Sequence, residues 1–130
     1  MTRHTALATR FAVVIILTGL AACVEDSPVP GPGTLTATLV SPNGDEGAAV
    51  VSLYGDGIQS ISAIAPTEAF PRLDENGARV VLINPDGGLI EFRFTLADTL
   101  LMPDVVVEEV AGPNDELRAD TGAYSVEVTR

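Results

Sequence analysis

Apolar and polar residues alternate along much of the chain from residue 34 onwards. The clearest run spans 89–96, where isoleucine, phenylalanine, phenylalanine and leucine occupy the even positions and polar residues lie between them. Because successive side chains of a strand point to opposite faces, the even positions are predicted to face a hydrophobic core. The segment 34–40 alternates in the same way, with Leu35, Ala37 and Leu39 predicted to point inwards and threonines outwards. Both segments therefore predict strands that are buried on one face.

Several other short segments also have the composition of strands. They are 48–54, 58–65, 79–83, 105–110 and 124–129. The segment 58–65 has isoleucine at every third position, which would also fit a turn of helix, but its β-branched residues and short length favour a strand. The segment 67–73 contains Pro71 and follows Pro66, so we expect an edge strand or a loop. Residues 84–88 are predicted to form a hairpin loop.

These segments amount to seven or eight short strands, and no window after residue 23 predicts a long amphipathic helix. The pattern predicts an all-β fold, a single β-sandwich with an immunoglobulin-like or related topology. The stretch 87–110 is similar to the later strands of cohesin-type sandwiches, which scaffold extracellular assemblies. That resemblance implies the same kind of fold and assigns no binding residue.

The first 23 residues have a different pattern, which is typical of a secretory signal peptide. Residues 1–10 carry two arginines and no acid, and residues 11–20 are almost entirely apolar. Two alanines follow, and then Cys23, the only cysteine in the chain. A basic start, a short apolar run and a small-residue end indicate an export signal. A transmembrane helix is the alternative, but it needs about 20 apolar residues, and two acids follow Val24 at once.

The tetrad Leu20-Ala21-Ala22-Cys23 resembles the lipobox of bacterial lipoproteins, in which an apolar residue and two small residues precede an invariant cysteine. The resemblance covers residues 1–23 only. It implies that the Cys23 thiol receives a diacylglyceryl group, that a signal peptidase cleaves between Ala22 and Cys23, and that the new amino terminus is acylated. Two or more acyl chains hold a protein stably on a membrane, because each buried CH₂ contributes about 0.8 kcal/mol.

The same resemblance implies a location. The chain is expected to be exported and lipid-anchored in the bacterial cell envelope. In enteric bacteria an aspartate directly after the lipidated cysteine retains a lipoprotein in the inner membrane. Val24 occupies that position here, which favours the outer membrane in a cell that has one.

Prolines and glycines crowd the segment after Cys23. Residues 24–33 contain three prolines and two glycines, which exclude a helix or a central strand. In a polyproline-like state this segment would span about 30 Å. We therefore expect three parts: a signal peptide at 1–22, a lipidated cysteine with a flexible tether at 23–33, and a β-sandwich domain at 34–130.

The chain is acidic beyond the signal peptide. All 18 acids follow Cys23, together with five arginines and no lysine, so the exported part carries a formal net charge of −13. Such a surface repels phosphate backbones, which excludes nucleic acid as a partner. Solubility and repulsion from the anionic membrane surface account for the acidity most simply. The expected partners are the membrane, through lipidated Cys23, and a protein or carbohydrate of unknown identity.

Residues that most enzymes use are missing from the exported part. His4 is the only histidine and lies in the signal peptide, and the part after Cys23 has no lysine, no tryptophan and no further cysteine. Ser-His-Asp, Cys-His and Schiff-base chemistry therefore cannot be built from it. Zinc and copper sites that need imidazole or thiolate are excluded as well. We expect a non-enzymatic binding or structural module with no cofactor and with no catalytic or metal-binding residue assigned.

Carboxylates leave two alternatives open. The first is a calcium-dependent binding module, since calcium prefers oxygen ligands. The acidic turns that could supply them are Asn43/Asp45/Glu46, 74–76, Asp86 and 114–116, the last of them in the longest connection. However, Asn, Asp and Gly also occupy turns for backbone reasons alone. The second alternative is a hydrolase with two carboxylates that face each other across a cleft.

Tyrosines and arginines complete the set of candidate residues. Tyr54 and Tyr124 could line a binding face, but we expect each to be a strand tyrosine with a buried ring and a hydrated hydroxyl. Phe92 and Phe94 are expected in the core. The five arginines of the exported part are expected on solvated strand faces.

Overall fold

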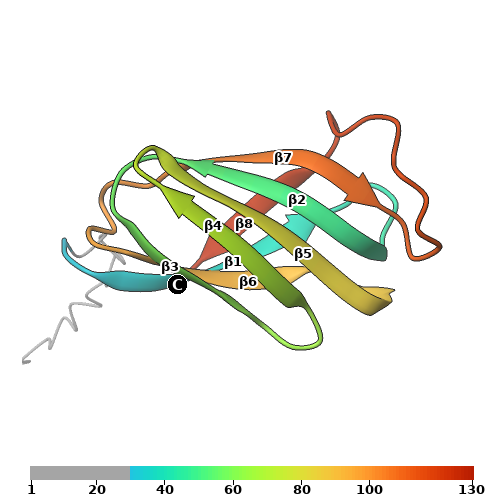
Figure 1. Cartoon of the computed structure of the whole chain (residues 1–130), viewed down its shortest axis with the longest axis horizontal. Coiled ribbons are helices and arrows are strands. Elements are labelled where there is room, and N and C mark those ends of the chain that lie inside the picture. The colour runs from blue at the N-terminus through green and yellow to red at the C-terminus, as the bar shows by residue number, and fades with distance from the viewer. Residues whose placement is uncertain (1–29) are drawn as a thin grey trace, which may run out of the picture.

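The computed structural model describes residues 30–130 of the chain (Figure 1). Eight strands make up this part, and they confirm the predicted all-β fold. They are β1 (Gly33–Val40), β2 (Glu46–Tyr54), β3 (Ile58–Ala63), β4 (Glu68–Asp74), β5 (Gly77–Gly88), β6 (Glu91–Leu96), β7 (Asp104–Ala111) and β8 (Ser125–Thr129). Within the described range, no helix is long and apolar enough to span a bilayer.

The strands form two antiparallel four-stranded sheets packed face to face as a β-sandwich. One sheet has the order β3-β6-β1-β8 and the other β4-β5-β2-β7. Of the strands that are consecutive in the chain, β4 and β5 alone pair with each other. At every other connection the chain crosses from one sheet to the other, so each sheet combines strands that are distant in sequence (Figure 1).

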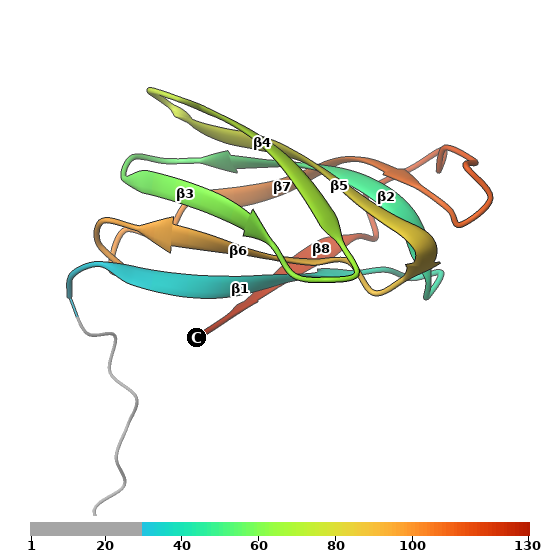
Figure 2. The same cartoon turned by 60° about the horizontal axis from the view of Figure 1, so that its bottom comes forward.

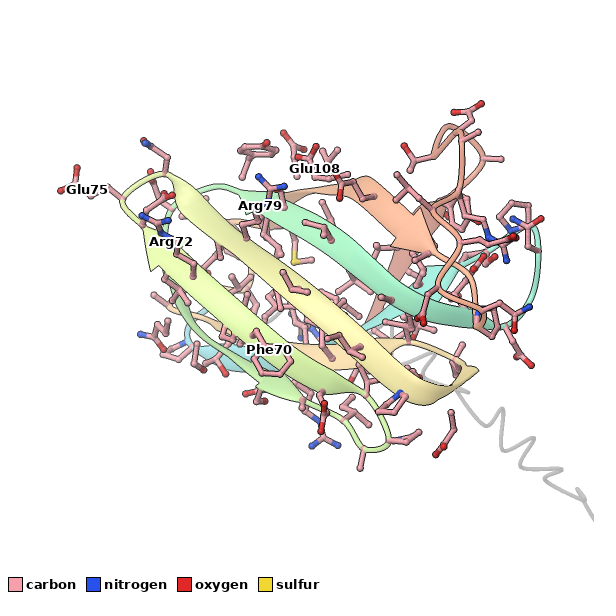
Figure 3. All side chains as sticks on the ribbon, turned by 45° about the vertical axis from the view of Figure 1, so that its right-hand side comes forward. Phe70, Arg72, Glu75, Arg79 and Glu108 are labelled. Atoms are coloured by element: carbon pink, nitrogen blue, oxygen red, sulfur yellow. The ribbon has the colours of Figure 1, made fainter. Side chains whose placement is uncertain are left out.

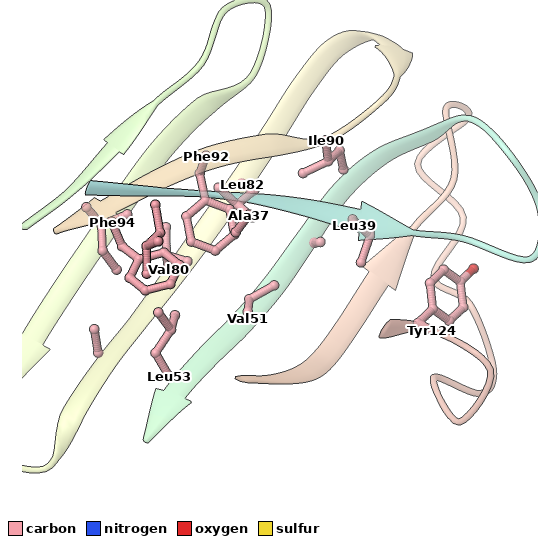
Figure 4. Packing of buried hydrophobic residues seen from close by; sticks show 14 of the residues in the cluster. Ala37, Leu39, Val51, Leu53, Val80, Leu82, Ile90, Phe92, Phe94 and Tyr124 are labelled. Carbon is pink, nitrogen blue, oxygen red and sulfur yellow. The ribbon is translucent and has the colours of Figure 1, made fainter. Parts of the chain in front are cut away.

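Alternate residues from both sheets meet in the hydrophobic core. As predicted, the even positions from Ile90 to Leu96 are at most 1% exposed, and Leu35, Ala37 and Leu39 point inwards beside them. The rings of Phe92 and Phe94 pack with their centroids 6.2 Å apart. Figure 4 shows these rings opposite the inward side chains of β2 and β5, with Tyr124 at one end of the core.

Two local predictions met different outcomes. The segment 67–73 is largely β4, an edge strand, and an edge tolerates Pro71 because one side of the strand needs no partner. The hairpin loop predicted at 84–88 is wrong, because these residues form the end of β5. A hairpin joins neighbours in one sheet, whereas β5 and β6 lie in different sheets, and the buried Asn84 side chain bonds the Leu89 carbonyl at 3.0 Å where the chain crosses.

The two ends of the sandwich carry different loops (Figure 2). At the end where β1 begins lie the β2–β3 turn, the β4–β5 turn and the β6–β7 loop 97–103; we call it the tether end. At the opposite end, the far end, lie the β1–β2 turn and the long β7–β8 connection 112–124. The β4-β5-β2-β7 sheet presents its outer face along the whole length between them.

Candidate functional site

The acidic turns proposed as calcium ligands are spread over both ends of the sandwich. Asp74 Oδ1 accepts a hydrogen bond from the Asn76 N–H at 2.8 Å within its own turn. Asp115 has a left-handed backbone conformation, with φ at 62°, and its N–H donates to the Gly112 carbonyl at 3.0 Å. Across residues 30–130, no three Asp, Glu, His or Cys residues lie close enough to hold a metal ion together. Asp74 and Asp115 therefore stabilise the turns in which they lie.

Glu46 differs from the other acids of these turns because it is buried, with 1% of it exposed at the start of β2. Arg118 donates to Glu46 Oε2 from Nε and Nη2 at 3.1 and 3.0 Å. Ser41 Oγ and Tyr124 Oη donate to Oε1 at 2.6 and 2.7 Å. Asn43 Nδ2 donates to Tyr124 Oη at 2.7 Å. We call these five residues the Glu46 cluster.

Close backbone contacts bring the Glu46 cluster together. Gly47 approaches the β7–β8 connection so closely that a Cβ there would lie 2.6 Å from the Gly112 carbonyl oxygen. A Cβ on Gly112 would lie 2.8 Å from Arg118 Nη2. The Arg118 N–H donates to the Val110 carbonyl at 2.8 Å, which fixes the backbone that carries the guanidinium. Glycine at both positions therefore allows the arginine to reach the carboxylate.

The electrostatics of the Glu46 cluster keep its carboxylate charged. Burial alone would raise the pKa of Glu46, but hydrogen bonds from Ser41, Tyr124 and Arg118, with the charge of Arg118, lower that pKa below the usual 4.5. The hydrogen bond to Glu46 raises the pKa of Arg118 in return. Each carboxylate oxygen already accepts two hydrogen bonds, so Glu46 offers no open position to a metal ion or a substrate. The Glu46 cluster therefore holds the β7–β8 connection against the β1–β2 turn at the far end.

The two tyrosines have opposite environments. Tyr124 has the expected buried ring (Figure 4), and its hydroxyl bonds two protein side chains, Glu46 and Asn43. The buried ring predicted for Tyr54 is wrong, since 53% of this residue is exposed. The alternation within β2 contained the signal: Leu53 points into the core, so its neighbour Tyr54 has to point out. Tyr54 Oη donates to Glu108 Oε1 at 3.1 Å.

Tyr54 belongs to a surface that the sequence did not single out, the outer face of the β4-β5-β2-β7 sheet. Figure 3 shows Phe70 and Arg72 on β4, Arg79 on β5 and Glu108 on β7 of this sheet. Phe70 is 56% exposed and pairs in register with Val81, itself 39% exposed. An aromatic side chain and a β-branched one therefore lie in the open beside the arginines.

Arg72 and Arg79 lie directly opposite each other on neighbouring strands. Like charges in this arrangement destabilise a sheet. Among the described residues the one ion pair joins Glu46 to Arg118, and neither Arg72 nor Arg79 has a carboxylate within 4.0 Å. Folding alone gives no reason for two unpaired cations to be neighbours in a chain with 18 acids and 7 arginines.

An open hollow of about 300 Å³ lies beside Arg79 near the β4–β5 turn. Its polar lining comes from Ser52, Tyr54, Asp74, Asn76, Arg79 and Glu108. In the hollow, Asp74 Oδ1 accepts from the Asn76 N–H and Glu108 Oε1 accepts from the Tyr54 hydroxyl. The hollow therefore combines the Arg79 guanidinium with hydroxyl groups and two carboxylates, which suits binding of a polar group.

Ala22 and Cys23, the residues expected at the cleavage and lipidation site, precede residue 30 and so lie outside the described residues. Comparison of the chain with models of protein families, with curated proteins and with solved structures finds no match.

Proposed function

We propose that this chain is a lipid-anchored β-sandwich of the bacterial cell envelope that binds a protein partner and performs no catalysis. Cys23 is the anchor, at the end of a tetrad that resembles a lipobox. The described fold begins with β1 at Gly33, ten residues after that cysteine, so a short segment separates anchor and domain. Val24 directly after the anchor favours the outer membrane.

The observation that carries the binding proposal is the group of Phe70, Arg72 and Arg79 on the outer face. Aromatic residues and arginine are enriched where proteins bind one another, and they contribute most of the binding free energy there. A carboxylate placed between two guanidinium groups would remove their mutual repulsion and can accept paired hydrogen bonds. The partner is therefore inferred to present an acidic side chain to the arginines and an apolar one to Phe70.

The acidity of the rest of the chain makes this site selective. With a formal net charge of −13 on the exported part, an acidic partner is repelled elsewhere on the surface. Charge interactions are screened beyond about 8 Å at physiological salt. The attraction of Arg72 and Arg79 for a carboxylate therefore offsets that repulsion only when the partner is docked close to them. Charge complementarity of this kind fixes orientation more than it raises affinity.

The anchor is tested by metabolic labelling with palmitate. The wild-type chain is expected to incorporate label and to fractionate with membranes, because acylation of Cys23 holds it there. Cys23→Ala is expected to lose both properties, whereas Val24→Ala, which leaves the cysteine in place, is expected to keep them. Label and membrane association that persist in Cys23→Ala would contradict the anchor.

The binding surface is tested by chemical crosslinking in native membranes, followed by mass spectrometry of what is captured. Arg79→Glu reverses a charge on the outer face and is expected to lose the partner that the wild-type chain captures. Arg93→Glu is the matched control, because Arg93 is also an exposed strand arginine but lies on β6 of the other sheet. Equal capture by both variants, or equal loss, would remove the outer face from consideration.

A further inference from the structure

The β6–β7 loop carries three consecutive apolar side chains in the open. Leu100, Leu101 and Met102 are 49%, 62% and 48% exposed. Between residues 30 and 130 no other three consecutive large apolar residues are exposed; at the far end Leu89 is exposed beside Val40, and Leu117 is exposed with no apolar neighbour in sequence. Single exposed apolar residues are ordinary, whereas contiguous ones mark contact with another protein or a membrane.

Hydrogen bonds tie this loop to the beginning of the described chain. Asp98 Oδ1 accepts from the Gly31 N–H at 3.3 Å and from the Leu100 N–H at 2.9 Å. The Thr99 N–H donates to the Gly31 carbonyl at 2.9 Å, and the Leu101 N–H donates to the Asp98 carbonyl at 3.1 Å. Asp98 thus holds the segment that leads back to Cys23 and the apolar tip of the loop in one fixed unit.

The length of chain before this unit brings the loop within reach of the anchor. Pro30 follows Cys23 by seven residues, and seven residues span at most about 25 Å even when fully extended. The far end lies a full strand length further away (Figure 2). Of the two ends of the sandwich, the tether end therefore lies nearer to a bilayer that holds the acyl chains of Cys23.

We propose that Leu100, Leu101 and Met102 insert into the bilayer surface and fix the orientation of the sandwich on the membrane. This inference rests on the lipid anchor proposed at Cys23. Three adjacent apolar side chains gain by leaving water for the boundary between headgroups and acyl chains. The excess of acids on the exported part disfavours anionic headgroups, so the surface that suits the loop is zwitterionic.

Single-tryptophan variants test this contact, because the chain contains no tryptophan of its own. The full lipidated protein is reconstituted into phosphatidylcholine vesicles with and without bromine on the acyl chains. Leu101→Trp is expected to emit at shorter wavelength than in water and to be quenched by the brominated lipid. Leu117→Trp is the matched control, since Leu117 is 69% exposed at the far end, and its emission is expected to stay water-like and unquenched.

Flotation of the vesicles separates the two proposals. Protein that does not float with the vesicles overturns the anchor and the loop contact together. Protein that floats while Leu101→Trp is quenched no more than Leu117→Trp overturns the loop contact alone. A blue shift of Leu101→Trp that grows with protein density, without bromine quenching, would show that a second copy covers the loop, and it overturns the lipid contact as well.

Discussion

Replacing Glu46 by glutamine tests whether the Glu46 cluster holds the far end of the sandwich. The substitution keeps the size of the side chain but removes its charge and replaces one oxygen by an NH₂ donor. In the wild type, Arg118 Nε and Nη2 donate to Glu46 Oε2 at 3.1 and 3.0 Å. In one orientation of the glutamine amide, the NH₂ donor faces these two donors. In either orientation Arg118 loses its countercharge.

The size of the effect follows from burial. Removing one partner of a buried ion pair costs about 3–5 kcal/mol. The Glu46 side chain is 1% exposed but the Arg118 side chain is 28% exposed, so water can solvate the freed guanidinium in part. We therefore expect Glu46→Gln to lower the free energy of unfolding by about 3 kcal/mol, the lower end of that range. At about 4–8 °C per kcal/mol for a domain of roughly 100 residues, Tm falls by about 12–24 °C.

Thermal melts and urea titrations followed by circular dichroism at neutral pH measure this change. Glu127→Gln is the matched control, because Glu127 is an exposed acid on β8, and a surface change of this kind is expected to stay within about 0.5 kcal/mol. A second comparison uses Arg118→Met: in that background Glu46→Gln should cost less than in the wild type, since contacting residues are not additive.

Two results would refute this reasoning. One is a Glu46→Gln variant that melts with the Glu127→Gln control. The other is an equal cost of Glu46→Gln with and without Arg118, which would mean that the ion pair contributes nothing to folding.

Further predictions concern pH, the neighbouring hydroxyl, the core and a close backbone contact. Because the pKa of Glu46 is lowered in the folded state, its contribution to stability is complete above the unfolded value of 4.5 and is lost as the pH falls through the folded value. Urea titrations at decreasing pH should therefore show that the free energy of unfolding falls more steeply in the wild type than in Glu46→Gln. Parallel curves of this free energy against pH would contradict the prediction. Tyr124→Phe removes the hydroxyl that donates to that carboxylate and should cost about 1–2 kcal/mol in the same assay; Tyr54→Phe, at an exposed residue, should stay within about 0.5 kcal/mol. Phe92→Ala opens a cavity in the core and should cost about 3–5 kcal/mol in thermal melts, and a cost below about 1 kcal/mol would mean that this ring is not packed as described. Gly112→Ala places a Cβ 2.8 Å from the guanidinium, so limited proteolysis should cut the β7–β8 connection faster than in the wild type; unchanged cleavage would show that the contact can relax.

Local alternation was sufficient to predict the fold class and the inward face of the clearest strands. The even positions from Ile90 to Leu96 are buried as expected, because a period of two depends only on the geometry of one strand. The same geometry would have placed Tyr54 outside, since it follows the inward Leu53. The tetrad ending at Cys23 is likewise a purely local signal, and it carries the proposed anchor without any folded structure.

Contacts between distant parts of the chain could not be predicted in this way. In the sequence, Glu46 looks like any other acid in a turn. The fold brings Tyr124 and Arg118 into contact with it, from 78 and 72 residues away in the chain. Arg118 was expected on a solvated strand face for the same reason. The hairpin predicted at 84–88 failed because turn composition does not say whether the next strand joins the same sheet.

The sequence by itself thus determined that the chain forms a β-sandwich, which side of its clearest strands is buried, and that the segment ending at Cys23 resembles a lipoprotein signal. Only the tertiary structure decided that Glu46 is buried and paired, that Arg72 and Arg79 are neighbours, and that the apolar tip at Leu101 lies beside the start of β1. The physical reason is that alternation reports the local burial of a strand, whereas pairing between strands is set by how all eight pack together.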